Sequence, residues 1–338
     1  MTDDPAVSVL SMVRGAWITM ALRAGVVLGV FEALDSPLTV DEAAGRTGSD
    51  PSAFGRLVRV LVDSGLVEEA PHRTYRNTAL GSCLRKDHPS RMCDLVLMQA
   101  SLPNLAAWRA LDEAIRTGSS TYERVNGHSS WDDLARDPQA QRIFNSAMAR
   151  RGSDQATAVL EASVLPGSGT VVDVGGGRGA LLAEILEEIT GQQGILYDQP
   201  DVAAEAELAF GSTDLADRAT CVGGDFFDQV PPGGDVYLIA NVLHDWDDDA
   251  ATAILRSVRA VIPQHGCVLV VERVLDAPGR SFDELRDVHL VDLHMMVMFG
   301  ARERSQREYD LLLTRAGFTA SEMSGTGDWN VLRSRPIG

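Results

Sequence analysis

Lysine is almost absent from this sequence, since Lys86 is the only one among 338 residues. The C-terminal half therefore cannot form a Schiff base, and it has no Tyr-x-x-x-Lys pair of the kind that a nicotinamide-dependent dehydrogenase would use. Positive charge is scarce as well: the formal net charge is −18, and residues 166–338 carry 13 arginines against 28 acidic residues. Such a surface repels phosphate backbones and anionic membranes, so we expect no nucleic-acid or membrane partner.

Cysteines are few and scattered. There are four, with no C-x-x-C pair among them: Cys83, Cys93, Cys221 and Cys267. This number is too small for a disulfide scaffold, so we expect free thiols. Cys83, His88 and Cys93 do not have the spacing of a tight zinc site, and no fourth ligand is apparent near them. We therefore expect no bound metal.

The sequence also shows no export signal. Its first four residues, M-T-D-D, carry the wrong charge for a secretory signal peptide. The apolar stretch 7–34 is interrupted by Arg14 and Arg23, so no uninterrupted apolar run approaches the roughly 20 residues that a membrane helix needs. We expect a cytoplasmic protein.

The N-terminal stretch is rich in apolar residues. Residues 5–34 indicate helices that are apolar on nearly every face, and such helices must be buried. In a small domain a second subunit can supply the cover, so we expect a homodimer. The chain length favours about two domains. We place boundaries after residues 95 and 165, which gives a dimerisation domain at 1–95, a helical linker and substrate-pocket region at 96–165, and a third region at 166–338.

The segment after this stretch has the order of a winged helix. Thr39 and Glu42 form a capping box before one short helix, Pro51 opens a second helix that Gly65 ends, and a two-stranded wing follows up to residue 78. A DNA-binding role would need more basic residues on the second helix, which offers only two arginines and an acid. We therefore expect a winged-helix scaffold that serves dimerisation.

Residues 166–338 alternate short apolar strands with amphipathic helices. This pattern predicts an α/β fold with a Rossmann-like, doubly wound parallel sheet. The first strand runs into V-D-V-G-G-G-R-G-A at 172–180, where Gly175 and Gly177 allow a tight turn and close approach of a ligand. The glycines alone also fit a dinucleotide-binding turn. Asp173 distinguishes a dinucleotide site from a site for S-adenosylmethionine. Its carboxylate repels a pyrophosphate but attracts the ammonium and sulfonium groups of S-adenosylmethionine.

Two later strands end in residues suited to a nucleoside. Asp198 ends the second strand, where a carboxylate can accept both ribose hydroxyls. Asp225 and Phe226 follow the third strand in G-G-D-F-F, and they suit the amino group and the face of adenine. Phe226 fits core packing equally well.

Six motifs in order carry a family resemblance: D-V-G-G-G-R-G (173–179), Y-D-Q-P (197–200), G-G-D-F-F (223–227), L-H-D-W (243–246), V-V-E-R-V-L (270–275) and A-R-E-R-S-Q-R-E (301–308). Residues 170–335 resemble the class I methyltransferases. The whole chain is similar to the caffeate-type and bacterial natural-product small-molecule O-methyltransferases, which join a winged-helix dimerisation domain to a domain that binds S-adenosylmethionine.

The resemblance implies roles for single residues. His244 matches the family's general base, Glu272 and Glu303 match the two acids that flank it, and Asp245 matches a residue near the methyl donor. Met148 and Met296 match positions at which family members line the acceptor pocket, and we expect Phe144, Trp246 and Phe299 to line it as well. Phe299 is apolar at a position that is polar in plant relatives, which makes the expected pocket more apolar than theirs. The expected acceptor is therefore an aromatic small molecule of secondary metabolism other than a plant-type substrate.

A histidine at the end of the fourth strand suits this chemistry, because a phenol must lose its proton as it attacks the methyl group. The phenol's pKa near 10 exceeds that of histidine, near 6.5, by roughly 3.5 units, and a carboxylate on the far ring nitrogen narrows this gap. Glu272 is the expected partner. Asp247, Asp248 and Asp249 would only begin the next helix. A nicotinamide-dependent dehydrogenase and a winged-helix ligand-sensing regulator stay open as alternative functions.

Overall fold

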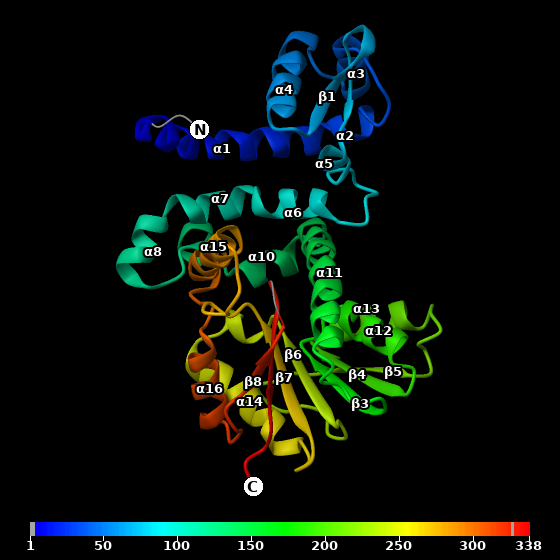
Figure 1. Cartoon of the computed structure of the whole chain (residues 1–338), viewed down its shortest axis with the longest axis vertical. Helices are drawn as coiled ribbons and strands as arrows, with labels where there is room; N and C mark the ends of the chain where they lie inside the picture. The colour runs from blue at the N-terminus through cyan, green and yellow to red at the C-terminus, as the bar shows by residue number, and fades with distance from the viewer. Residues whose placement is uncertain (1–3, 326–327) are drawn as a thin grey trace. The chain divides into compact units, whose positions relative to one another are not determined.

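The structure is a computed structural model, which describes residues 4–325 and 328–338 and all their side chains except those of residues 149–151 (Figure 1). The chain forms two compact units. Unit 1 comprises residues 1–105 and 134–147, and unit 2 comprises residues 106–133 and 148–338. The expected division into three regions at residues 95 and 165 was made from the sequence pattern, and it stays a prediction.

Unit 1 is mostly helical. Its helices are α1 (Pro5–Leu28), α2 (Val30–Ala33), α3 (Val40–Thr47), α4 (Pro51–Asp63), α5 (Ala79–Ser82) and α6 (Met92–Gln99). The short strands β1 (Val67–Ala70) and β2 (Thr74–Asn77) flank the 3₁₀ turn η1 (Pro71–Arg73). Three helices contribute residues to both units: α7 (Leu102–Arg109), α10 (Ser130–Arg136) and α11 (Pro138–Glu161).

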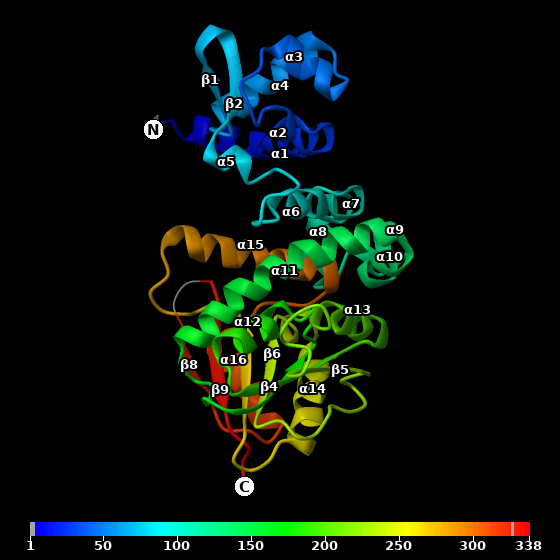
Figure 2. The same ribbon diagram turned by 90° about the vertical axis from the view of Figure 1, so that its right-hand side faces the viewer.

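The expected pair of helices and hairpin is present in unit 1 (Figure 2). Thr39 and Glu42 form the capping box of α3, and the side chain of Asp50 caps α4 ahead of Pro51. β1 and β2 pair antiparallel, as a wing would. The element order therefore matches the sequence prediction, while the assignment of this unit to the winged-helix class stays a prediction.

Helix α1 exposes much of its apolar surface within the single chain. The exposed large side chains on it are Val7, Val9, Leu10, Met12, Val13, Trp17, Ile18, Met20, Val27 and Leu28. By length and composition alone, α1 could also cross a membrane, which the interrupted sequence pattern had argued against. A helix of this kind needs a cover that the chain itself does not supply, either a second protein surface or lipid.

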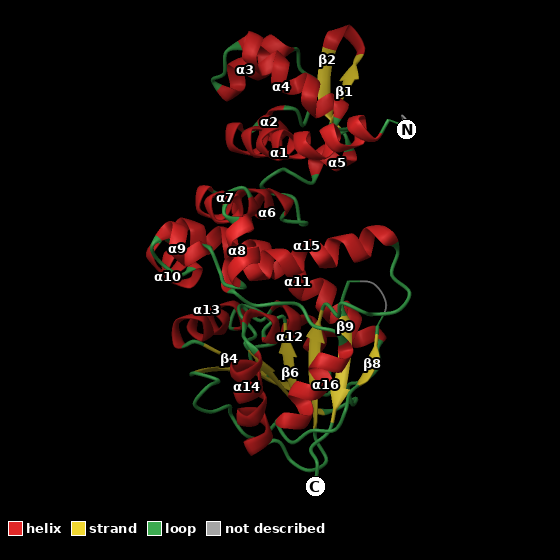
Figure 3. Ribbon diagram, turned by 90° about the vertical axis from the view of Figure 1, so that its left-hand side faces the viewer, coloured by secondary structure: helices red, strands yellow, loops and turns green. Residues whose placement is uncertain are grey.

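Unit 2 is built on a seven-stranded sheet with the strand order β5-β4-β3-β6-β7-β9-β8. Figure 3 shows strands of this sheet in yellow and the helices in red. The strands are β3 (Gly169–Val174), β4 (Gln192–Asp198), β5 (Ala219–Gly223), β6 (Val236–Ala240), β7 (Cys267–Glu272), β8 (Glu322–Ser324) and β9 (Asn330–Ser334). The first five are parallel, as expected. β8 and β9 run antiparallel at one side, so the sheet is mixed and not wholly parallel.

Helices cover both faces of this sheet. Buried residues of α14 (Asp248–Val261) and α16 (Gln306–Arg315) pack on one face. Buried residues of α12 (Ala180–Glu188), α13 (Pro200–Phe210) and the C-terminal part of α11 pack on the other. The remaining helices of unit 2 are α8 (Leu111–Thr117), α9 (Tyr122–Asn126) and α15 (Phe282–Phe299). This three-layer arrangement is the doubly wound fold that the alternation of strands and helices predicted.

The strand order reverses between β3 and β6, because β4 and β5 extend the sheet on one side of β3 and β7 extends it on the other side of β6. Open α/β sheets bind ligands outside the carboxyl ends of their strands at such a reversal. Asp173 lies near the carboxyl end of β3, the turn containing His244 follows β6, and Glu272 ends β7. The fold therefore brings these sequence-predicted residues to one edge of the sheet.

Candidate active site

The turn that contains His244 is held in place by a buried acid. β6 ends at Ala240, and the 3₁₀ turn η2 (Leu243–Asp245) follows. One carboxylate oxygen of Glu272 accepts hydrogen bonds from the backbone N–H groups of Val242, at 3.1 Å, and Leu243, at 2.9 Å. Glu272 thus fixes the backbone that leads into His244.

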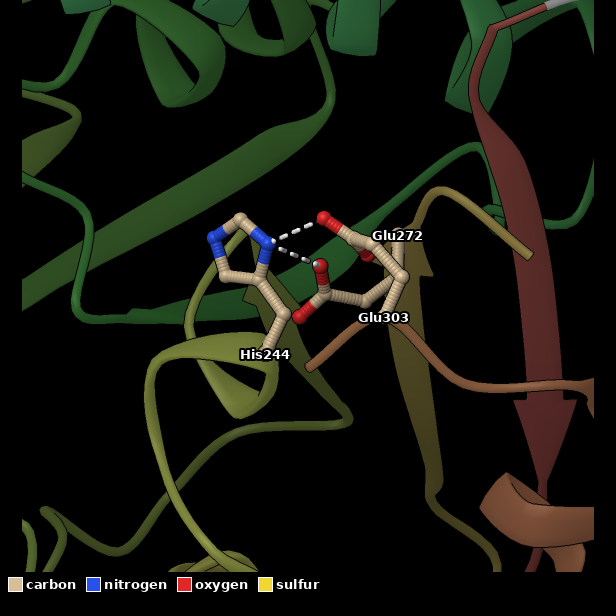
Figure 4. A group of neighbouring side chains, drawn as sticks. All are labelled: His244, Glu272 and Glu303. Carbon is tan, nitrogen blue, oxygen red and sulfur yellow. Dashed lines mark hydrogen bonds and ion pairs between the residues drawn. The ribbon is translucent and has the colours of Figure 1, made fainter. Parts of the chain in front are cut away.

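His244 lies between two acidic side chains (Figure 4). Its Nδ1 is hydrogen-bonded to Oε1 of Glu303 at 2.8 Å, whereas Oε2 of Glu272 lies 3.9 Å from the same nitrogen. All three side chains are at most 2% exposed. The expectation that Glu272 is the hydrogen-bonded partner of the histidine was wrong, because Glu303 makes that hydrogen bond. One oxygen of Glu272 binds the η2 backbone, and the other stays 3.9 Å from Nδ1.

The other ring nitrogen of His244 points away from the two glutamates (Figure 4). Nε2 lies 3.5 Å from Oδ1 of Asp245, which is too long for a good hydrogen bond. With Nδ1 bonded to a carboxylate, Nδ1 carries the proton in the neutral ring and Nε2 has the free lone pair. Nε2 is therefore the atom that can accept a proton from a ligand.

The charges around His244 change its basicity. Burial alone would lower the pKa of His244, but the negative charges of Glu272, Glu303 and Asp245 outweigh burial and raise this pKa to about 9. Burial raises the pKa of Glu272 to about 7, with the charge of Glu303 acting in the same direction. The raised pKa brings His244 close to the ordinary value of a phenol, near 10, which is favourable for proton transfer between the two.

A second buried residue of the A-R-E-R-S motif holds the same turn. Arg304 is fully buried and donates to the backbone carbonyl of Leu243 at 2.8 Å and to that of Trp246 at 2.7 Å. It also forms an ion pair with Asp248 at 2.9 Å. Glu303 contacts the imidazole while Arg304 holds the backbone on both sides of it. Sequence reasoning assigned Arg304 no role, and only its place beside Glu303 could have suggested one.

The acids after His244 behave largely as expected. The side chain of Asp247 accepts hydrogen bonds from the backbone N–H groups of Asp249 and Ala250, and so caps α14. Asp248 does more than begin the helix, since it binds Arg304. Another unpredicted contact is that Asp292, on α15, accepts a hydrogen bond from the backbone N–H of Glu303 at 2.9 Å. These contacts fix the loop that presents Glu303.

On the side of β3, a buried acid has no positive partner. Asp173 is 1% exposed, and its Oδ2 has no hydrogen-bond partner in the described structure. Burial raises the pKa of Asp173 to about 7, and the nearby charge of Asp198 adds to this. A buried carboxylate of this kind is stabilised by a cation. The ammonium and sulfonium groups of S-adenosylmethionine fit that need.

The glycine-rich turn lies directly against Asp173. Gly175 and Gly177 both have a positive φ, at 77° and 57°. A Cβ atom at Gly176 would lie 2.6 Å from Oδ2 of Asp173 and would block the carboxylate. Asp198 accepts a hydrogen bond from the N–H of Gly177 at 2.8 Å. The absence of a side chain at Gly176 thus leaves the carboxylate of Asp173 unobstructed on this side, and the backbone of Gly177 holds Asp198 beside the turn.

Aromatic side chains gather near the carboxyl end of β5. The rings of Phe226 and Phe227 lie 5.0 Å apart, and Trp246 lies 4.7 Å from Phe227 and 6.0 Å from Phe226, all edge to face. Trp246 was expected to line the acceptor pocket, but the structure places it with the residues expected to bind adenine. Phe226 also packs partly on the core. Asp225 binds the N–H of Phe227 at 2.9 Å.

Of the residues expected to line the acceptor pocket, Met296 and Phe299 lie in the C-terminal half of α15. Phe299 stacks on Trp131 at a ring distance of 5.2 Å, and Met296 and Phe299 pack on a small cluster with Trp108. Met148 is half-buried in the part of α11 that belongs to unit 2. Phe144 belongs to unit 1, so its place in the acceptor pocket stays a prediction.

His244, Glu272 and Glu303 also resemble a set of metal ligands. Their donor atoms lie within 4.8 Å of one another, and one imidazole with two carboxylates can hold a divalent cation. The expectation of no metal rested on the spacing of Cys83, His88 and Cys93 and did not consider this group. A cation at Nδ1 of His244 would have to replace the 2.8 Å hydrogen bond to Glu303.

Comparison with known families agrees with this geometry. Residues 108–319 match the model of the O-methyltransferase domain, and residues 10–87 match the model of the O-methyltransferase dimerisation domain. The phenazine O-methyltransferase PhzM of Lysobacter antibioticus is 34% identical over 330 residues, which is 97% of this chain and 95% of that protein. The mitomycin biosynthesis 6-O-methyltransferase of Streptomyces lavendulae is 36% identical over 92% of this chain and 88% of that protein.

Solved structures extend the likeness to bound ligands. An O-methyltransferase from neocarzinostatin biosynthesis, in complex with S-adenosylmethionine and 2-hydroxy-5-methyl naphthoic acid, superposes with a TM-score of 0.80. It is 31% identical and covers 94% of this chain and 96% of its own. One relative differs in its acceptor: an 8-amino-8-demethylriboflavin N,N-dimethyltransferase of Streptomyces davaonensis is 33% identical over 89% of this chain and 86% of that protein.

Proposed function

The chain belongs to the O-methyltransferase family and is an S-adenosylmethionine-dependent enzyme, and from this premise we propose that it methylates a phenolic hydroxyl of an aromatic small molecule, with His244 as the general base. The observation that carries the proposal is the bond between Nδ1 of His244 and Glu303, because it leaves Nε2 as the free proton acceptor. Family membership removes the grounds for the two alternatives, a dehydrogenase and a ligand-sensing regulator.

S-adenosylmethionine supplies an electrophilic methyl group when it is bound. Nε2 of His244 takes the proton of the acceptor hydroxyl as the new O–CH₃ bond forms and the S–CH₃ bond breaks, and S-adenosylhomocysteine leaves as a neutral thioether. Glu303 stabilises the imidazolium that results, through its contact with Nδ1. Glu272 adds negative charge nearby and keeps the η2 backbone in place.

The donor site would be formed by the acids along β3 and β4. Asp173 would attract the ammonium group, since it is buried without a cation. Asp198 would accept the ribose hydroxyls beside the glycine turn, and Asp225 with Phe226 would receive the adenine. Trp246 packs on Phe226 and Phe227, which supports a place for it at the adenine end. Asp245 would lie between the donor and His244, since its carboxylate is 3.5 Å from Nε2.

The acceptor is proposed to be an aromatic compound of secondary metabolism, bound against Met148, Met296 and Phe299. An aromatic acid is one suitable class, because the structural neighbour from neocarzinostatin biosynthesis is named in complex with a naphthoic acid. An aromatic amine is a second candidate, since one relative is named as an N,N-dimethyltransferase. An amine with a neutral lone pair needs its base only after methyl transfer, so His244 would matter less for it.

We propose that the active form is a homodimer. The match of residues 10–87 to a dimerisation domain and the exposed apolar side chains of α1 support this. Light scattering should give a mass near twice the 36.3 kDa of one chain. A monodisperse monomer would contradict the dimer, and recovery only in a detergent extract of membranes would instead favour a membrane role for α1.

The reaction itself is tested with S-adenosylmethionine and a panel of hydroxylated aromatics. Mass spectrometry should find products heavier by one CH₂ group, together with S-adenosylhomocysteine. A matched panel of aromatic amines distinguishes the two acceptor classes. Absence of transfer to both panels, combined with no binding of S-adenosylhomocysteine, would contradict the proposed function.

A further inference from the structure

Among the arginine side chains of unit 2 that the structure describes, Arg273 and Arg304 are buried, and they differ sharply in their contacts. Arg304 is saturated, with two backbone carbonyls and the carboxylate of Asp248 around its guanidinium. Arg273 is only 8% exposed, yet in the described structure it has no ion pair, and its Nε and Nη1 are buried without a hydrogen-bond partner. A buried charge in this condition is costly unless something else pairs with it.

The guanidinium of Arg273 contacts an aromatic ring. It lies over the indole of Trp329, 4.4 Å from the ring centroid, and Trp329 is itself buried. A cation over an indole is stabilised and held in one orientation, but the ring accepts none of its in-plane N–H groups. The planar donors of Arg273 are thus fixed and still available.

The surroundings of Arg273 favour an anion. Arg280 lies close enough that the charge of Arg273 helps burial to lower the pKa of Arg280. Arg280 donates to Asn330 at 2.9 Å and to the backbone carbonyl of Asp328. Asp328, Glu284 and Glu303 also act on Arg280. Among the described residues, none of these acids forms an ion pair with Arg273, so the donors of the Arg273 guanidinium keep a place for a further negative group.

Arg273 also lies at the functional edge of the sheet. It follows Glu272, the last residue of β7, and β7 is separated from β3 by β6 alone. Strands are spaced by about 4.8 Å, so the ends of β3 and β7 are roughly 10 Å apart. A ligand that contacts Asp173 or His244 can therefore extend to this region.

We propose that Arg273 binds the carboxylate of a bound ligand, with Trp329 as the platform that orients its guanidinium. A carboxylate matches this group because its two oxygens can accept parallel hydrogen bonds from the planar fork. Two ligands can bring this chemistry: the methionine part of S-adenosylmethionine and an aromatic acceptor that is an acid. The second source rests on the proposed function, and the first requires only donor binding.

The donor source is tested by calorimetry on the full-length protein. S-adenosylhomocysteine has the carboxylate, and 5′-methylthioadenosine lacks it. If the donor carboxylate binds Arg273, then Arg273→Gln lowers the affinity for S-adenosylhomocysteine by about 10- to 100-fold, the range for a lost charge-assisted hydrogen bond. The affinity for 5′-methylthioadenosine stays unchanged, because this ligand has no carboxylate. Arg286→Gln is the matched control, because Arg286 is exposed and pairs only with Asp283 among the described residues.

The acceptor source is tested with 4-hydroxybenzoate and phenol as probes, each added to the protein saturated with S-adenosylhomocysteine. In this case 4-hydroxybenzoate should raise the melting temperature of the wild type more than phenol does, and Arg273→Gln should remove that difference. Arg273→Lys keeps the charge but loses the fork, and it serves as the second variant if Arg273→Gln does not fold. It should recover part of the carboxylate effect.

The inference is overturned if folded Arg273 variants bind all four probes as the wild type does. A wild type that binds S-adenosylhomocysteine no better than 5′-methylthioadenosine and 4-hydroxybenzoate no better than phenol also overturns it. Failure of the proposed function looks different, because the wild type would then bind neither S-adenosylhomocysteine nor 5′-methylthioadenosine.

Discussion

Two groups of buried carboxylates lie along the same edge of the unit 2 sheet, and they differ in the origin of their positive partner. Among the described residues, Asp173, on the β3 side, pairs with no positive group, whereas Glu303, on the β7 side, is bonded to His244. In the proposed function a cationic ligand would complete the first group, whereas the second contains its cation within the protein once His244 is protonated. This difference separates donor binding from proton transfer, so mutations in one group should leave the other function largely intact.

The largest effect is expected for His244→Gln. Glutamine retains much of the size and hydrogen bonding of histidine but cannot take the proton, so turnover should fall by roughly 10²–10⁴-fold. The affinity for S-adenosylhomocysteine should stay nearly unchanged. Turnover is measured at saturating donor, and calorimetry gives the affinity. His265→Gln, at an exposed histidine paired with Asp235, is the control and should retain activity. Equal turnover of wild type and His244→Gln would reduce His244 to a structural residue.

The next effect distinguishes the two glutamates. Glu303→Gln removes the charge that is hydrogen-bonded to Nδ1, so we expect a loss of turnover of about 10- to 100-fold, within the range of a charge-assisted contact. Glu272→Gln should cost less, because an amide oxygen can still accept from the backbone of Val242 and Leu243. If Glu272→Gln proved the more damaging, the 3.9 Å contact and not the 2.8 Å one would orient the base.

Binding of S-adenosylhomocysteine should depend on pH through Asp173. Burial raises the pKa of Asp173 to about 7, so below this value the carboxyl group is protonated and has no charge for the ligand's ammonium. The affinity should therefore rise as the pH is raised through about 7 and then level off, with up to about tenfold per pH unit on the acidic side. Asp173→Asn should bind about 10- to 100-fold more weakly at high pH and lose this pH dependence. A wild-type affinity that is flat across the range would contradict the assignment.

The smallest effect is expected from metal removal. If the hydrogen bond between His244 and Glu303 is the working state, dialysis against a chelator should leave turnover unchanged, and adding Zn²⁺ should inhibit by taking Nδ1 of His244. Metal analysis of the purified protein accompanies the assay. Loss of activity on chelation that Mg²⁺ or Zn²⁺ restores would instead make the three residues a metal site.

Much of the fold of unit 2 could be predicted from the sequence, because short apolar strands and amphipathic helices alternate between β3 and β7. Helix α15 gave a weaker signal, since the run M-M-V-M-F has no helical period. β9 runs antiparallel to β7, and β8 runs antiparallel to β9, so the directions of these two strands depend on tertiary pairing. The prediction of a wholly parallel sheet missed them because local sequence does not encode that pairing.

The site shows the same limit. The sequence and its resemblance brought His244, Glu272 and Glu303 together as one group, and the structure confirms that they meet. Which acid bonds the imidazole could not be predicted, because Glu303 reaches Nδ1 only through a loop held by Asp292. The neighbours of Trp246 in space could not be predicted either, because Phe226 and Phe227 come from a different strand end, and its expected place in the acceptor pocket stays a prediction.

The most direct test of His244 as the base is the pH dependence of methyl transfer in a single turnover, measured for wild type and His244→Gln with one phenolic acceptor. The nearby acids raise the pKa of His244 to about 9, so the wild-type rate should fall as the pH drops below this pKa. The positive charge of the bound sulfonium lowers the pKa of His244 and shifts the fall in rate to lower pH. The rate of His244→Gln should instead increase tenfold per pH unit up to the phenol's own pKa, near 10, where the two proteins converge. Parallel profiles at every pH would contradict general-base catalysis by His244 and leave positioning of the reactants as the source of the rate.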